Sequence, residues 1–302
     1  MMKIKNAHII AVILGLLITS SCLRLDSFMF NNSVIEEYLL DDYPYEVDFI
    51  LNESYNIHDT MIHLFVLESK LPEETTGVDI YSMYIGDINR IDTDTVVLYC
   101  HGNKDHMDFY WPRAKLLANA GGKNRYGIMT FDYRGFGLSE GIPTEEGMYA
   151  DVEAALSWLK EKGLTNDRLI VYGFSMGSAP ATKISAEDSF SMKPSKLILE
   201  NPFASFDVMV HDGAALTLPG SYISNLEIDN AEKIKDVNQA FMWIHGIDDS
   251  FLSIESHGEV IYKNYSGIYG EAHRVPDAEH STVPQTLGFE DYNEIIEAFV
   301  TY

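Results

Sequence analysis

Short apolar runs alternate with amphipathic stretches along most of this chain. An apolar run without polar interruptions is typical of a strand covered on both faces, whereas a strand with one solvated face alternates apolar and polar residues. An amphipathic stretch that ends at glycine, as residues 144–162 end at Gly163, is typical of a helix. The pattern predicts buried strands over residues 95–100, 126–131, 169–172, 196–199, 241–244 and 272–275, and helices over residues 113–120, 144–162 and 290–302.

Strands that alternate with helices in this way predict right-handed βαβ units. The expected fold is therefore α/β, with a doubly wound, mostly parallel sheet and helices on both of its faces. Ahead of the first buried strand, residues 46–50 and 62–66 alternate apolar and polar positions, which predicts edge strands or a hairpin over residues 46–92. No linker rich in Pro, Gly or Ser interrupts the remainder. We therefore expect one domain over residues 46–302, preceded by a tether over residues 22–45.

The first residues have the features of a secretory signal peptide. Lys3 and Lys5 make a basic start, residues 9–18 are apolar or glycine, and small residues follow up to Cys22. The apolar run is shorter than the ~20 residues that a membrane-spanning helix needs. We predict a signal peptide over residues 1–21, since the alternative of a buried N-terminal helix would call for a polar face that this stretch does not have.

Cys22 directly follows small residues, as the acylated cysteine of bacterial lipoproteins does. This stretch resembles a lipobox, although Thr19 stands where that pattern usually has leucine. The resemblance implies that Cys22 is lipidated and becomes the mature N-terminus. It further implies a lipid-anchored membrane protein of the bacterial cell envelope, with a secreted or periplasmic protein as the alternative.

The composition narrows the set of possible partners. The chain of 302 residues carries 21 Lys+Arg against 46 Asp+Glu, a formal net charge of −25, and a surface this acidic repels the phosphates of a nucleic acid. Cys22 and Cys100 are the two cysteines, too few for a disulfide framework. The histidines lack the spacing of a metal-ligand set, and no Gly-x-Gly-x-x-Gly follows a strand. Neither a metal nor a dinucleotide cofactor is therefore expected.

The motif Gly-Phe-Ser-Met-Gly at residues 173–177 directly follows a predicted strand and precedes a stretch that can continue as a helix. A sharp strand-to-helix turn of this kind exposes the serine hydroxyl near a helix N-terminus, whose partial positive charge favours a developing oxyanion. A second match, Gly-Leu-Ser-Glu-Gly at residues 137–141, does not follow a strand, and Pro143 discourages a helix behind it. This context selects Ser175 as the candidate nucleophile and rejects Ser139.

A serine nucleophile needs a base, and the base needs an acid that orients it. In this architecture both follow the serine along the chain, the acid first, and each stands at the carboxyl end of a later strand. His280 follows the last predicted strand and is the candidate base. Asp248 and Asp249 follow the strand before it. Asp249 is the preferred acid, and Asp248 and Glu200 remain as alternatives.

The first buried strand ends in Cys-His-Gly-Asn at residues 100–103. In this architecture the backbone N–H behind such a strand forms half of an oxyanion hole, and the residue after the nucleophile supplies the other half. The candidate donors are the backbone N–H groups of Asn103 and Met176. A simple tight turn at Gly102 is the alternative.

Together these segments resemble the α/β-hydrolase superfamily, and within it the small cap-less serine hydrolases of the BEM46-like group, of the serine aminopeptidase S33 type. The likeness runs from about residue 94 to residue 302 and includes Asp-Tyr-Arg-Gly-Phe-Gly at residues 132–137 and Glu-Asn-Pro-Phe at residues 200–203. In that group the acid stands four residues after the histidine of a His-Gly pair, which leads from His245 to Asp249 and supports the latter.

The resemblance implies a serine hydrolase that cleaves carboxylic esters or thioesters through an acyl-enzyme, on a small-molecule or acyl-lipid substrate. Members of the group include enzymes that remove acyl chains such as palmitate from lipidated proteins. The interval over residues 200–239 is too short for a separate cap domain, so an open site is expected. The alternatives are a peptidase or amidase of the same fold and a non-catalytic binding module of the envelope. The sequence leaves the oligomeric state open.

Overall fold

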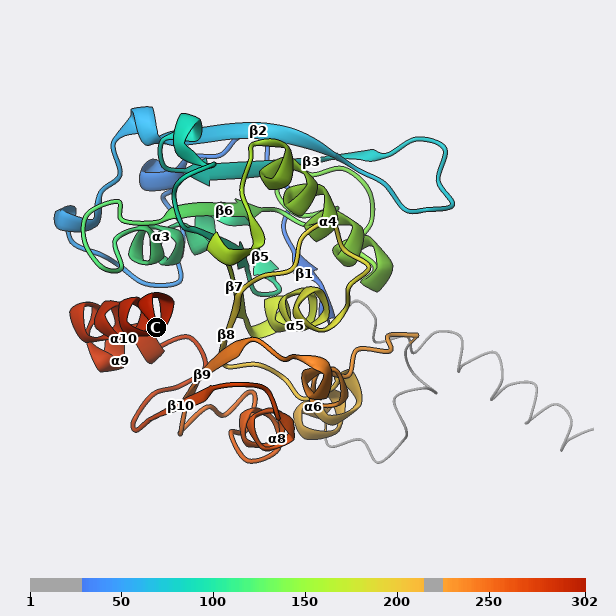
Figure 1. Ribbon diagram of the computed structural model, residues 1–302, viewed down its shortest axis with the longest axis vertical. Helices are drawn as coiled ribbons and strands as arrows, with labels where there is room; N and C mark the ends of the chain where they lie inside the picture. The colour runs from blue at the N-terminus through green and yellow to red at the C-terminus, as the bar shows by residue number, and fades with distance from the viewer. Residues whose placement is uncertain (1–28, 215–224) are drawn as a thin grey trace, which may run out of the picture.

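The computed structural model describes residues 29–214 and 225–302. The predicted signal peptide over residues 1–21 and the predicted lipidation site Cys22 lie outside these ranges. The described chain forms an eight-stranded sheet and a separate two-stranded one (Figure 1). In spatial order the strands of the large sheet are β10 (Gly270–Val275), β9 (Ala240–Gly246), β8 (Lys196–Glu200), β7 (Leu169–Phe174), β4 (Val96–Cys100), β6 (Gly127–Phe131), β3 (Val78–Ile85) and β2 (Ile62–Ser69).

The large sheet is mostly parallel, as the sequence pattern predicts. The strands from β10 to β6 run parallel to their neighbours, and β3 and β2 complete one edge in antiparallel pairing. All six are confirmed as strands, with bounds that differ by one or two residues. The prediction that residues 272–275 are buried is wrong, because β10 lies at the end of the sheet and only its Val275 is buried. The strands β4, β6, β7 and β9 are buried along their whole length, which explains why their sequences are continuous apolar runs.

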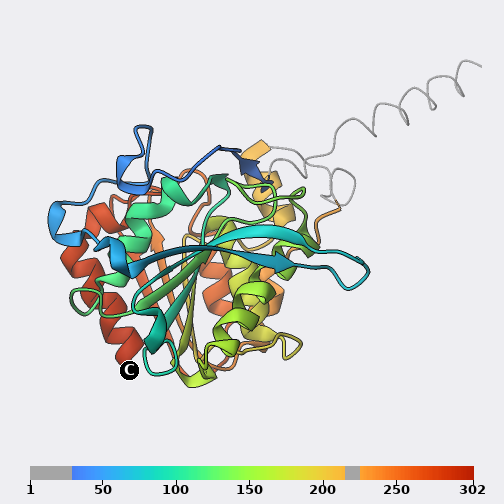
Figure 2. The same ribbon diagram turned by 90° about the horizontal axis from the view of Figure 1, so that it is seen from above.

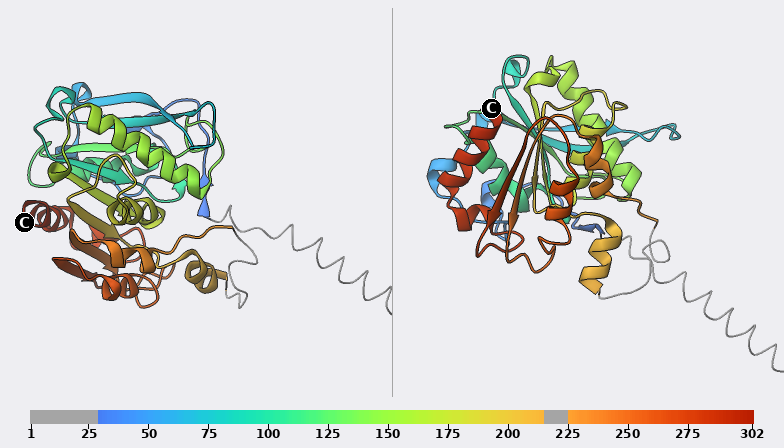
Figure 3. Two further views of the ribbon diagram at one scale, coloured as in Figure 1. Left: turned by 45° about the vertical axis from the view of Figure 1, so that its right-hand side comes forward. Right: turned by 60° about the horizontal axis from the view of Figure 1, so that its bottom comes forward.

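Helices cover both faces of this sheet (Figure 3), so the prediction of a doubly wound α/β fold is confirmed. One apolar cluster lies under α3 (Met107–Ala118), α9 (Val283–Leu287) and α10 (Phe289–Thr301). A second cluster lies on the opposite face, under α4 (Glu145–Glu161), α5 (Ser178–Ala186) and α8 (Gly258–Asn264). Because β10 to β6 run parallel, their carboxyl ends lie along one side of the sheet, between the two layers of helices. We call this side the carboxyl edge of the sheet.

Helix α3 begins earlier than the sequence predicts. The expected start is residue 113, but the helix starts at Met107 and contains Pro112. The side chain of His106 accepts a hydrogen bond from the Asp108 N–H and so caps the first turn. All residues of α3 are buried, so tertiary packing outweighs the cost of one proline.

The predicted hairpin is half right. Strands β2 and β3 pair in antiparallel fashion from Ile62–Ile85 to Ser69–Val78, and Figure 2 shows their turn projecting beyond the helices. Residues 46–50, by contrast, do not form the predicted strand. Asp48 and Phe49 are buried there because the Asp48 carboxylate accepts a hydrogen bond from Arg113 of α3 at 2.7 Å, and the guanidinium lies over the Phe49 ring.

The stretch from residue 29 to residue 45 was expected to be part of a tether, and the structure differs from that expectation. Met29 and Phe30 are buried in the core. The short strand β1 (Asn31–Asn32) pairs in parallel with β5 (Lys104–Asp105), directly behind β4. We call residues 29–42 the N-terminal strap. The strap packs because its polar backbone finds partners, such as the Asp108 carboxylate that accepts from the N–H groups at positions 39 and 40.

The interval between β8 and β9 packs several described apolar residues, among them Phe206 and Ile234, into the core. Its described part holds α6 (Phe206–Ala214) and α7 (Asn230–Lys233) and no large cap. Over the described ranges, the helices are too short or too polar to cross a membrane.

Replacement of Phe30 by alanine tests the packing of the strap. Phe30 is 8% exposed, whereas Val34 in the same segment is 77% exposed. Because Phe30→Ala removes buried apolar surface and leaves a cavity, it should lower the free energy of unfolding by about 3 kcal/mol. Val34→Ala is the control and should change it by less than about 0.5 kcal/mol. Urea denaturation of the mature protein measures both, and a Phe30→Ala variant as stable as the control would contradict a packed strap.

Candidate active site

Ser175 stands at the sharp turn between β7 and α5. Its φ of 52° lies in the left-handed region, and a single 3-10 turn (Ser175–Gly177) leads into the helix at Ser178. A Cβ at Gly177 would come within 1.9 Å of the Cys100 carbonyl oxygen, and one at Gly173 within 2.5 Å of the Gly177 oxygen. Gly177 is therefore required for the turn to pack against the end of β4, and Gly173 for the turn to fold back over its own strand.

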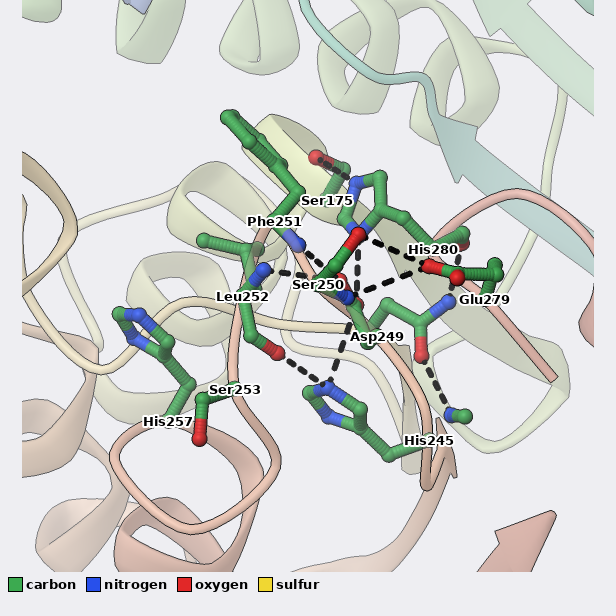
Figure 4. A network of polar contacts seen from close by, with 12 residues as sticks. Ser175, His245, Asp249, Ser250, Phe251, Leu252, Ser253, His257, Glu279 and His280 are labelled. Carbon is green, nitrogen blue, oxygen red and sulfur yellow. Dashed lines mark hydrogen bonds and ion pairs between the residues drawn. The ribbon is translucent and has the colours of Figure 1, made fainter. Parts of the chain in front are cut away.

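The structure brings the three predicted side chains of Ser175, His280 and Asp249 into one row (Figure 4). His280 Nε2 lies 2.9 Å from the Ser175 hydroxyl oxygen, and His280 Nδ1 lies 2.7 Å from an oxygen of Asp249. Asp249 follows β9 and His280 follows β10, so neighbouring parallel strands deliver them to the same edge. The Asp249 side chain is fully buried, and the His280 side chain is 18% exposed.

The surroundings of Asp249 keep its carboxyl group charged. Burial raises the pKa of Asp249, but contacts from His245 and His280 and the Leu252 N–H outweigh burial, so that the pKa lies well below its usual range. One carboxylate oxygen accepts from the backbone N–H groups of Phe251 and Leu252, at 2.9 and 2.8 Å. A carboxylate can only accept, so His280 Nδ1 carries the proton and Nε2 is free to accept the proton of the Ser175 hydroxyl.

Asn201 connects the two loops that carry the acid and the histidine. Its side-chain N–H donates to the backbone carbonyl of His280, and its side-chain oxygen accepts from the Gly246 N–H at 2.9 Å. The residue has a φ of 42°, a conformation that asparagine tolerates better than most residues. The sequence placed Asn201 in a motif without a role, although its position directly after β8, at the same edge of the sheet, could have indicated one.

Neither alternative for the acid is the partner of His280 Nδ1, which is Asp249. Asp248 is exposed. Glu200 is buried and its carboxylate accepts from Arg113 at 2.5 Å, as well as from Tyr172 and Tyr292 at 2.5 and 2.7 Å. Since these three donors occupy it, Glu200 forms part of a buried charged network beneath the turn that carries the serine.

Ser139, of the second Gly-x-Ser-x-Gly motif, and His257, near the acid loop, both have structural partners. The Ser139 hydroxyl donates to the Asp132 carbonyl and accepts from the Tyr81 N–H. His257 is buried, which lowers its pKa to about 4, and its Nδ1 accepts from the Ala204 N–H at 3.0 Å. His257 is therefore neutral and shapes the loop.

Asn103 and Met176 lie at the same edge as Ser175. Cys100 and Gly173 are paired in register, so Asn103 and Met176 each stand three residues beyond the same level of the sheet. The Asn103 carbonyl accepts from the Asn31 N–H of the strap at 2.9 Å. This adjacency is what a two-donor oxyanion hole needs, and the role of the two N–H groups stays a prediction.

Metal ligands do not gather in the described part of the chain: His, Cys, Asp and Glu side chains nowhere come together there in groups of three or more that could hold an ion.

The strand order, the strand-to-helix turn at Ser175 and the loops behind β9 and β10 define an α/β-hydrolase. The family described as serine aminopeptidase, S33 matches residues 91–242. The chain belongs to this family and is a hydrolase of the α/β fold.

Two other α/β-hydrolase domain-containing proteins are similar in sequence to part of this chain. The α/β-hydrolase domain-containing protein aho-3 of Caenorhabditis elegans is 29% identical over 190 residues, which are 62% of this chain and 52% of that protein. The human α/β-hydrolase domain-containing protein 17B is 27% identical over 170 residues, or 55% of this chain and 54% of the human protein. The matches thus span about half the length of these two relatives.

Solved structures share the fold. An esterase of Pyrococcus furiosus superposes with a TM-score of 0.64, over 90% of this chain and 98% of its own, at 18% identity. An esterase from Exiguobacterium antarcticum superposes with a TM-score of 0.58, over 78% of this chain and 99% of its own, at 19% identity. At such identities the likeness establishes the common fold.

Replacement of Asn201 by aspartate tests whether this side chain positions His280. Asn201→Asp keeps the size and the tolerance for positive φ, but it removes the N–H that holds the His280 carbonyl. Because a small displacement of the histidine costs much of its reactivity, the rate at which a fluorophosphonate labels Ser175 should fall by about 10- to 100-fold. Asn264→Asp is the control, since Asn264 donates to the Ala231 carbonyl away from the site. Labelling of Asn201→Asp at the wild-type rate would show that His280 is positioned without Asn201.

Proposed function

We propose that the protein is a serine hydrolase that cleaves carboxylic esters or thioesters through an acyl-enzyme. The observation that carries this proposal is the row of contacts from the Ser175 hydroxyl through His280 to Asp249. A hydroxyl, an imidazole and a buried carboxylate in this order are the three parts of a nucleophile activated by a general base.

In the proposed reaction the Ser175 oxygen attacks the acyl carbon while His280 Nε2 takes the hydroxyl proton. Asp249 stabilises the imidazolium that forms, and the backbone N–H groups of Asn103 and Met176 donate to the oxyanion. The bond to the leaving alcohol or thiol then breaks, and the leaving group takes the proton from His280. Water attacks the acyl-enzyme with the same histidine as base, which releases the carboxylic acid and restores the serine.

Two features support an acyl ester or thioester as the substrate. In the described part of the chain no large cap covers the site. The ring of Phe251 packs against His280 at 5.1 Å, and Phe251 is 38% exposed. An open site with an exposed aromatic side chain suits an acyl chain attached to a bulky leaving group. Two solved structures of the same fold are titled esterases.

Amide or peptide cleavage is the second candidate, because the matching family is described as a serine aminopeptidase. The two bond types are distinguished by comparing esters and thioesters of several acyl-chain lengths with amino-acid amides, on the same enzyme preparation. A higher kcat/KM for amides would replace the ester proposal.

Replacement of Ser175 by alanine tests the proposed nucleophile. Ser175→Ala should abolish covalent labelling by a fluorophosphonate and lower kcat for an ester by at least about 10⁴-fold, because the acyl-enzyme cannot form. Ser139→Ala is the matched control, since that serine stands in the second Gly-x-Ser-x-Gly motif. Labelling that persists in Ser175→Ala, or no labelling of a folded wild-type protein, would overturn the proposal and favour a binding module.

We also propose that Cys22 is lipidated and anchors the enzyme to the cell envelope. An anchored enzyme would meet acyl-lipid substrates at the membrane surface. Mass spectrometry of the mature protein should find an acylated N-terminus at Cys22, and Cys22→Ser should release the protein from the membrane fraction. An unmodified N-terminus at another residue would contradict the anchor and leave the secreted or periplasmic alternative.

A further inference from the structure

The N-terminal strap runs along the loops that follow β4 and β6. The Asn31 N–H donates to the Asn103 carbonyl, and two residues further along the strap the Ser33 N–H donates to the Asp105 carbonyl at 3.3 Å. On its other side the Ser33 carbonyl accepts from the Gly137 N–H at 2.8 Å. The strap thus joins the predicted oxyanion loop to the loop behind β6, and it lies outside residues 91–242, which the family matches.

The peptide between Gly102 and Asn103 carries the N–H assigned to the oxyanion hole. Its carbonyl oxygen, on Gly102, lies 2.7 Å from Nδ1 of His101. A carbonyl can only accept, so Nδ1 carries the proton and donates it. Because a peptide is planar, a hydrogen bond that holds the carbonyl also sets the direction of the N–H on the opposite side.

The His101 ring is in contact with Asp132. His101 Nε2 lies 3.1 Å from one oxygen of Asp132, and both side chains are fully buried. The ring also packs between Tyr110 and Tyr133, whose centroids lie 4.9 and 4.6 Å away. A buried carboxylate needs a hydrogen-bond donor to keep its orientation, and the donor to this carboxylate lies on its other oxygen.

Tyr38 of the strap is that donor. Its hydroxyl lies 2.5 Å from the second oxygen of Asp132 and accepts in turn from the Leu138 N–H at 3.2 Å. Burial and the charge of Asp132 raise the pKa of Tyr38 well above its usual value, so the hydroxyl keeps its proton and donates.

Gly137 leaves the space for this contact. Its φ is 55°, and a Cβ at this position would come within 2.1 Å of the Asp132 oxygen and 2.5 Å of the Tyr38 hydroxyl. The loop behind β6 therefore has a residue without a side chain at the place where the tyrosine meets the carboxylate.

We propose that Tyr38 is a positioning residue of the oxyanion hole, which acts through Asp132 and His101 on the peptide between Gly102 and Asn103. The inference rests on the proposed function, because it assigns the Asn103 N–H to the developing oxyanion. A segment ahead of the matched family region then orients a group that acts in the transition state.

Tyr38→Phe removes only the hydroxyl and keeps the ring, which packs beside Tyr81 at 6.0 Å. Loss of a whole oxyanion donor costs about 10²- to 10³-fold in kcat, so a donor that is merely less well oriented should cost about 10-fold. KM should stay within about 2-fold, because the ground-state carbonyl depends less on this N–H. A trifluoromethyl ketone, which forms a tetrahedral oxyanion on the serine, should lose affinity by the same factor as kcat/KM.

Ser139→Ala is the matched control. The Ser139 hydroxyl also makes two hydrogen bonds, but it donates to the backbone carbonyl of Asp132 rather than to its carboxylate. A merely structural role of Tyr38 predicts similar effects of both variants on the melting temperature and on kcat. The proposal predicts a loss of kcat and of inhibitor affinity in Tyr38→Phe alone.

The outcomes separate this inference from the proposed function. An active wild type together with a Tyr38→Phe variant of unchanged kcat and inhibitor affinity overturns the inference and leaves the proposed function intact. Equal losses of kcat in both variants also overturn the inference. A folded wild type that neither reacts with a fluorophosphonate nor hydrolyses any ester overturns the proposed function, and the inference falls with it.

Discussion

The close approach of two backbones underlies the arrangement of this protein's site. Gly177, behind the nucleophile turn, packs so tightly on the Cys100 carbonyl that a side chain at this position would overlap it. That approach brings the end of β7 against the end of β4, and with it Ser175 beside the loop that carries Asn103. The parallel course of β9 and β10 then delivers Asp249 and His280 to the same edge. The sheet thus fixes the relative positions of chemical groups that are up to about 180 residues apart along the chain, because each group follows a strand whose neighbours define its level.

Buried charge is the second constraint, and each buried carboxylate is matched by donors. Asp249 has two backbone N–H groups and two histidines, Glu200 has Arg113 and two tyrosines, and Asp132 has Tyr38. Carboxylates that are buried without donors would be protonated or would turn away, so each set of donors decides what its carboxylate does. Two of these networks include residues from the N-terminal part of the chain. Tyr38 donates to Asp132, and Arg113, which donates to Glu200, also donates to Asp48. Residues ahead of the matched family region therefore contribute to the interior around the site.

Particular residues show which elements a local sequence pattern predicts and which it does not. The apolar runs predicted the parallel strands inside the sheet, because a strand covered on both faces has no polar side to interrupt it. The sixth strand, β10, lies at the end of the sheet and carries His273 and Arg274. Local pattern failed at residues 46–50, where the buried Asp48 pairs with Arg113 and no strand forms. It also failed at the start of α3, where burial of the whole helix outweighs Pro112. The strap lies within residues 22–45, for which the sequence predicts a tether. The backbone and the carboxylates of the strap find hydrogen-bond partners far along the chain. The Asp41 carboxylate, for example, accepts from Trp111 and Lys115. A local sequence pattern cannot indicate such distant partners.

By itself the sequence determined the α/β fold, the strand-to-helix turn at Ser175 and the order of serine, acid and histidine, because these depend on residue types next to each other and on their place behind predicted strands. Only the tertiary structure decided between Asp249 and its alternatives Asp248 and Glu200 as the partner of His280, since all three follow strands and differ only in what surrounds them. It likewise decided that Asn201 joins two loops and that Tyr38 meets Asp132. The physical reason is that hydrogen-bond partners are chosen by distance and direction in space, which the order of residues along the chain does not contain.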